Sequence, residues 1–167
     1  MKALALVLLS FILLVPLHAA NVVPDPFQPA LISSLTIEKH DGDTVTTIQM
    51  VGDALYYKRI VQGKVTDQAT VHPTGDDWFK FIQGLNNAKV YKWLPKYYYP
   101  GQGATWYIDL GMENRPFTSA GTNEYPKEGA EDQAQADPKA GPSIPFLIFW
   151  QAALELVGKA PPPPKTN

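Results

Sequence analysis

The chain has 167 residues, of which 14 are basic and 16 acidic, so its formal net charge is −2, and it contains no cysteine. The lack of cysteine excludes disulfides, a lipid-attachment cysteine and thiol chemistry. The slightly acidic balance argues against nucleic acid or an anionic membrane as the main partner.

The N-terminal segment MKALALVLLSFILLVPLHAA has one lysine, then an apolar run, and it ends in small residues. This pattern predicts a signal peptide over residues 1–20, and therefore an exported protein, periplasmic or secreted, with no stable membrane span after cleavage. Loss of Lys2 with this segment would change the net charge to about −3. Three prolines without any periodicity predict an extended leader over residues 21–30.

Four segments of alternating apolar residues follow, and Asp41-Gly42, Gly52-Asp53 and Gln62-Gly63 separate them. Short turn signals between alternating segments indicate hairpins. We therefore expect a four-stranded antiparallel meander with one buried face, beginning near Leu31.

A helix is predicted next, because a Thr-Gly-Asp-Asp capping pattern begins at Thr74. Its apolar stripe has helical spacing and consists of Trp78, Phe81, Ile82 and Leu85. Alternation around Trp106 predicts a fifth strand, and residues 117–119 can return as a sixth. A second helix is expected after Ser143, nearly engulfed, because residues 146–157 contain only two polar residues.

These elements predict a single α+β domain over residues 31–158, with the order ββββαββα. Its antiparallel sheet, a four-stranded meander plus a two-stranded hairpin, would be covered by two helices on one side. Residues 127–142 are rich in Ala, Gly, Pro and acidic residues, which predicts a mobile insertion. Residues 159–167 form a Pro-rich tail that we expect to be disordered.

The sequence predicts no catalytic residue, no metal site and no cofactor. His40, Asp41 and Asp43 are close together, but a hairpin turn explains them better than a cation site. Ser119 lacks the glycine two places earlier that a nucleophile elbow needs. Phosphate loops, dinucleotide fingerprints and zinc-protease helices are also absent from the sequence.

The stretch VYKWLPKYYYPGQGATWY, residues 90–107, is dense in aromatic residues. Trp93 and Trp106 are expected in the core, since Trp106 is in phase with the apolar residues of the fifth strand. Three consecutive tyrosines, Tyr97 to Tyr99, cannot all face one way on an extended segment. They are interpreted either as a ligand surface or as a structural crossing segment between helix and strand.

Several aromatic, glycine and proline residues form a pattern with defined spacing. Its parts are Trp78-Phe79-x-Phe81, Val90-x-x-Trp93, Tyr97, Gly103-x-x-Trp106-x-Ile108-x-Leu110 and Ser119-x-Gly121-x-Asn123-x-Tyr125-Pro126. Over residues 74–158 this spacing, with the final apolar helix, resembles a small domain of uncharacterised exported bacterial proteins. The resemblance implies a fold and carries no assigned activity. The chain departs from it at Gln102, where Asp is usual, and by the insertion. Gly121 and Asn123 are expected to have positive φ, with the Asn123 amide bonded to nearby main chain.

The leading functional hypothesis is a non-catalytic binding or interaction module for a protein or glycan of the cell envelope, without nucleic acid. Exposed tyrosine rings suit such contacts, and the candidate contact residues are Tyr97, Tyr98, Tyr99, Asn123 and Tyr125. One alternative is a hydrolase with a carboxylate site near Asp109 and Glu124. Another is a structural or assembly subunit, such as a homo-oligomer, that pairs through the apolar C-terminal helix.

Overall fold

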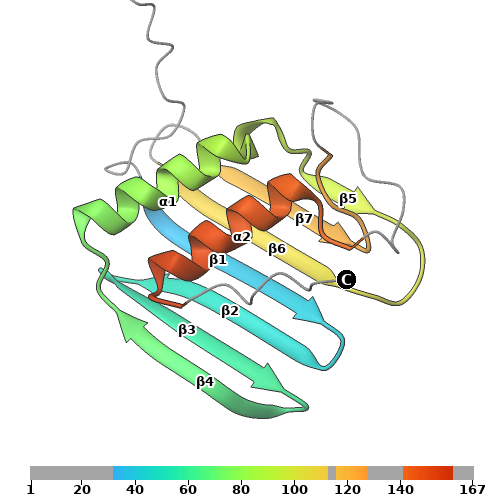
Figure 1. Ribbon diagram of the computed structural model, residues 1–167, viewed down its shortest axis with the longest axis horizontal. Coiled ribbons are helices and arrows are strands. Elements are labelled where there is room, and N and C mark those ends of the chain that lie inside the picture. The colour runs from blue at the N-terminus through green and yellow to red at the C-terminus, as the bar shows by residue number, and fades with distance from the viewer. Residues whose placement is uncertain (1–31, 113–115, 128–140, 160–167) are drawn as a thin grey trace, which may run out of the picture.

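The computed structural model describes residues 32–112, 116–127 and 141–159. These residues form one seven-stranded sheet with two α-helices packed side by side on one of its faces (Figure 1). The predicted signal peptide over residues 1–20 and leader over residues 21–30 lie outside the described residues. So do most of the predicted insertion and all of the predicted tail beyond Lys159.

The elements follow one another as β1 (Ile32–Asp41), β2 (Thr44–Val51), β3 (Ala54–Val61), β4 (Lys64–Val71), α1 (Gly75–Asn87), the 3₁₀ turn η2 (Val90–Lys92), β5 (Lys96–Tyr98), β6 (Thr105–Met112), β7 (Phe117–Thr122) and α2 (Ile144–Leu156). The strand order in the sheet is β4-β3-β2-β1-β6-β7-β5. The α+β class, the meander and the two helices are confirmed.

The predicted strand count and element order were wrong in detail, because β5 is a strand and not only a connection. It pairs parallel with β7, so the sheet is mixed rather than purely antiparallel. A strand of three residues is too short for its alternation to be detected in a sequence. The observed order is therefore ββββαβββα when η2 is left aside.

The meander is closed by two-residue turns at the three predicted places. Gly42, Gly52 and Gly63 have φ of 58°, 64° and 74° there, a backbone region that other residues rarely adopt. The antiparallel register places Ile37, Ile48 and Tyr57 side by side, and all three are buried. This face of β1 to β3 belongs to the core beneath the helices.

The first helix has the predicted capping box. Thr74 Oγ1 accepts a hydrogen bond from Asp77 N, and Thr74 N donates to Asp77 Oδ2 at 2.8 Å. Gly84 allows α1 to approach α2 closely, because a Cβ there would lie 2.3 Å from the Cβ of Ala152. The two helices thereby form one continuous layer over the sheet (Figure 1).

The second helix is nearly engulfed, as predicted, and Ser143 caps it by accepting a hydrogen bond from Phe146 N. Its exposed strip also contains Ile144 and Leu147 besides the two expected polar residues. Among the described residues, no helix is long and apolar enough to cross a membrane. Because both helices cover the same face, no described helix lies on the opposite face of the sheet, which we call the open face (Figure 1).

Candidate functional site

Trp106 lies in β6 on the helix-covered face and is 3% exposed. Its ring contacts four other rings with centroid distances of 5.1 to 6.4 Å, and these belong to Trp93, Tyr97, Tyr125 and Phe146. Edge-to-face and offset ring pairs at these distances stabilise a fold beyond the area they bury. The two tryptophans of the aromatic stretch are thus core residues, as predicted.

Gly121 lies in β7 between Tyr97 of β5 and Trp106 of β6 in the strand register. Strands two positions apart are separated by about 10 Å, yet the rings of Tyr97 and Trp106 have centroids only 5.7 Å apart. A Cβ on Gly121 would lie 2.2 Å from Trp106 Nε1. The missing side chain therefore lets the two rings meet, whereas the positive φ expected for Gly121 is not observed.

Asn123 has the predicted positive φ, 55°. Its Nδ2 donates hydrogen bonds to the carbonyl oxygens of Gly101, at 2.8 Å, and Tyr99, at 3.4 Å. Ser119 Oγ donates to the carbonyl oxygen of Leu94 at 2.6 Å. The two polar side chains of the Ser-x-Gly-x-Asn motif therefore hold the segments on both sides of β5, Ser119 from within β7 and Asn123 from just after it.

Glu124 closes this arrangement from both its main chain and its side chain. Its carbonyl oxygen accepts a hydrogen bond from Trp106 Nε1 at 2.9 Å, and its Oε2 accepts one from Tyr98 N at 2.6 Å. The carboxylate thereby satisfies a backbone donor of the short edge strand β5, a group that would otherwise need water or another chain.

The two carboxylates of the hydrolase alternative do not meet. Asp109 accepts a hydrogen bond from Thr118 Oγ1 across β6 and β7, whereas the Glu124 carboxylate bonds to Tyr98 N. Tyr98 lies two strands away from β6, in the ladder row of Thr105. That row is four residues from Asp109, so the groups are roughly 16 Å apart, beyond the separation of about 10 Å that paired catalytic carboxylates use. Among the described residues, no three His, Asp or Glu side chains are grouped to hold a metal.

The five candidate contact residues fall into two sets. Tyr97, Asn123 and Tyr125 are buried, at 4%, 7% and 6% exposed, whereas Tyr98 and Tyr99 are 59% and 38% exposed. The division follows from the alternation of a strand, because Tyr97 faces the core and its neighbour must face the other way. The structure therefore leaves Tyr98 and Tyr99 available for contact with a ligand and places the other three in the interior.

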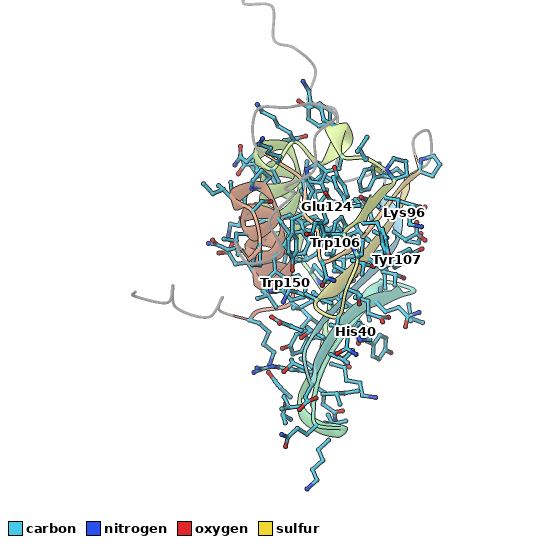
Figure 2. The ribbon with its side chains drawn as sticks, turned by 90° about the vertical axis from the view of Figure 1, so that its right-hand side faces the viewer. His40, Lys96, Trp106, Tyr107, Glu124 and Trp150 are labelled. Atoms are coloured by element: carbon cyan, nitrogen blue, oxygen red, sulfur yellow. The ribbon has the colours of Figure 1, made fainter. Side chains whose placement is uncertain are left out.

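Tyr98 shares the open face with Tyr107 of β6, which is 39% exposed and which sequence reasoning did not select. One ladder row joins Lys96, Ala120 and Tyr107, and the next row on the same face, two residues farther along the strands, joins Tyr98, Thr122 and Thr105. Figure 2 shows Lys96 and Tyr107 on the side of the sheet away from the helices. The outward direction of Tyr107 could have been predicted from the sequence, since it lies on a strand between two residues, Trp106 and Ile108, that were expected to face the core.

We call this part of the open face the tyrosine face and define it as Lys96, Tyr98, Thr105, Tyr107 and Thr122. Lys96 Nζ lies 5.9 Å from the centroid of the Tyr98 ring, a cation–π contact. Rings, hydroxyls and an ammonium group can stack on a ligand and hydrogen-bond to it.

The neighbouring part of the open face is also polar. His40 Nε2 contacts Glu38 Oε1 beside the ladder row of Tyr107, so each has its partner within β1. The row continues into β2 at Thr47. The tyrosine face thus adjoins a polar row of the open face, and the exposed Tyr56 and Val65 lie on the same face farther away, in β3 and β4.

No protein-family model, curated protein or solved structure matches the chain. The function proposed below therefore rests on the geometry of the tyrosine face.

The tyrosine triplet should separate into structural and surface residues when its members are replaced singly. Tyr97→Ala removes a buried ring and the hydroxyl that accepts a hydrogen bond from Leu94 N at 2.8 Å. We expect it to lower the free energy of unfolding by about 3 kcal/mol or more. Tyr98→Ala should change it by less than about 0.5 kcal/mol. Urea denaturation measures both, and equal losses would contradict the placement.

A second prediction concerns pH. Burial raises the pKa of Tyr125 to about 12, and the Asp41 carboxylate adds to the rise. In the unfolded chain the phenol has its usual value near 10, so the unfolded state loses this proton first. The stability that neutral Tyr125 provides is complete below about pH 10 and is lost as the pH rises toward about 12.

Tyr125→Phe should therefore lose less stability than the wild type between about pH 9 and pH 11, when each is compared by urea denaturation. Tyr98→Phe is the matched control, since Tyr98 is exposed, and it should follow the wild type. A Tyr125→Phe profile that runs parallel to the wild type would show that this group does not contribute.

Proposed function

We propose that the protein is an exported, non-catalytic binding module whose tyrosine face binds an extended glycan of the cell envelope. The observation that carries the proposal is the exposure of the Tyr98 and Tyr107 rings on the sheet face that the helices leave uncovered. The export is an expectation from the N-terminal sequence alone.

The spacing of the two rings suits a ligand longer than one sugar unit. They are two strands and two residues apart in the ladder, which corresponds to roughly 12 Å. Between them lie Ala120, which is small, and the hydroxyl of Thr122. Aromatic faces can stack on sugar rings, and hydroxyl groups can both donate and accept hydrogen bonds to sugar hydroxyls.

A protein partner is less well supported by the same surface. A stable protein interface buries about 800 Å² on each partner and has a more apolar centre. Next to Tyr107, the ladder row continues through Glu38, Thr47 and Lys58. The charged and hydroxyl side chains of this row suit a polar ligand better than an apolar interface centre, and the apolar side chains of the same face, Val45, Ile60 and Val65, lie farther from the two rings, in β2 to β4.

Pairing of two copies through α2 also has little support. The exposed strip of α2 contains Ile144 and Leu147, but Gln151 and Glu155 continue it and bond to each other at 2.9 Å. A few exposed apolar side chains are normal on a monomer. The hydrolase alternative is not favoured either, because its two carboxylates lie far apart.

The proposal is tested by co-sedimentation of the full mature protein with insoluble envelope glycan that has been treated with protease. We expect the wild type to bind, and Tyr98→Ala and Tyr107→Ala each to weaken the affinity about threefold to tenfold, because each removes one stacking ring. Phe79→Ala is the matched control, since Phe79 is 53% exposed but lies on α1.

Two outcomes would overturn the proposal. One is a loss of affinity in the Phe79 variant as large as that in the tyrosine variants. The other is binding to untreated envelope material that disappears after protease treatment, which would identify a protein partner instead.

A further inference from the structure

A second candidate site lies on the helix side of the sheet, where β1 to β4 extend past α2. It is a cavity of about 390 Å³, which is within the range of small-molecule sites. Its apolar wall consists of Tyr57, Trp150 and Leu154, and Figure 2 shows Trp150 on the helix side of the sheet, beside α2. The tyrosine face is on the opposite side, so the two sites are independent.

The cationic groups of this cavity are not equivalent. Lys39 Nζ pairs with Asp41 at 2.9 Å, and Lys159 Nζ pairs with Asp67 at 2.8 Å. Each ammonium also lies over an aromatic wall, Lys39 at 5.8 Å from the Trp150 centroid and Lys159 at 5.0 Å from the Tyr57 centroid. Each of these two ammonium groups therefore has one carboxylate partner and one aromatic contact.

Arg59 is the third cation that lines the cavity, and it takes part in none of these contacts. It lies opposite Asp67 in the ladder of β3 and β4, but Lys159 holds that carboxylate. Among the described residues the Arg59 guanidinium has no hydrogen-bond or ion-pair partner. An arginine beside an aromatic wall is a ready partner for a planar anion, because its fork of donors matches two oxygen atoms.

The polar floor of the cavity supports the same interpretation. Thr46 is buried in β2 and lines the cavity next to Thr44, and its hydroxyl forms no hydrogen bond within the described part of the chain. Burial raises the pKa of Tyr57, and Asp67 adds to the rise while Lys159 and Arg59 oppose it. The Tyr57 hydroxyl therefore stays protonated at neutral pH, as a hydrogen-bond donor.

We propose that this cavity binds a small organic carboxylate, with its carboxylate on the Arg59 guanidinium and its apolar body between Tyr57, Trp150 and Leu154. A monoanion is favoured over a phosphate dianion, because Asp41 and Asp67 also face the cavity and would repel a second negative charge. The apolar wall requires a ligand with a hydrocarbon or aromatic body rather than a bare anion.

The test uses phenylacetate and phenylacetamide, which share a body and differ in charge. Each is titrated up to about 10 mM into the full mature protein, and the indole N–H signal of Trp150 is followed by NMR. We expect saturable binding of phenylacetate, at least tenfold weaker binding of phenylacetamide and no effect of inorganic phosphate at the same concentration.

Arg59→Gln should weaken phenylacetate binding at least tenfold, and Arg59→Lys should have an intermediate effect, since it keeps the charge but loses the fork of donors. Lys58→Gln is the matched control, because Lys58 is the adjacent exposed cation of β3 and points to the open face. It should bind like the wild type.

The proposal is overturned if phenylacetate does not bind in this range, if the acid and the amide bind equally, or if Arg59→Gln binds like the wild type. Competition by inorganic phosphate would overturn the choice of a carboxylate. Because Arg59 is exposed, loss of folding does not confuse these outcomes, and unchanged amide spectra elsewhere confirm that each variant is folded.

Discussion

The fold depends on the contact between the indole ring of Trp106 and the bare backbone of Gly121. Trp106 touches rings from the segment after α1, from β5, from the segment after β7 and from α2. Its N–H fixes the main chain at Glu124. One side chain thus joins segments that are far apart in the sequence, and it can do so only because β7 presents no side chain beneath it. Glycine in a strand interior usually weakens the strand, unless another group must approach its backbone closely.

This contact also decides which surface is left for function. Tyr97 turns inward to meet Trp106 over Gly121, so Tyr98 turns outward to the open face. Glu124, held by the same indole, satisfies the backbone N–H of Tyr98. The exposed ring of the tyrosine face therefore stands on a short edge strand whose position is set from within the core. A rigid support of this kind favours binding, because little order has to be imposed when a ligand arrives.

Much of the fold could be predicted because local patterns carry it. The alternation around Ile108, the helical stripe around Phe81 and the turn glycines identified β6, α1 and the hairpins. The inward direction of Tyr97 could not be predicted, because alternation fixes that neighbouring side chains oppose each other but not which one is buried. That choice depends on Gly121, a partner 24 residues later in the chain.

The cavity near Trp150 could not be predicted from the sequence, since its Lys159–Asp67 pair joins residues that are 92 positions apart. The predicted resemblance to a domain of exported bacterial proteins was based on residues that this structure uses for packing and main-chain hydrogen bonds. Gly121, Asn123 and Ser119 each have such a contact. These three residues therefore stabilise the fold, and the residues proposed for binding lie outside the Ser-x-Gly-x-Asn motif.

The most direct test of the central claim is a double-mutant cycle between Gly121 and Trp106, measured as free energies of unfolding. Gly121→Ala should cost about 3 kcal/mol in the wild type and at least about 1 kcal/mol less in a Trp106→Leu background, because that change removes the indole atoms nearest to the new methyl group and leaves only the Glu124 carbonyl oxygen close to it. Gly75→Ala, at a position with open space around it, should cost the same small amount in both. An equal cost of Gly121→Ala in the two backgrounds would contradict the account.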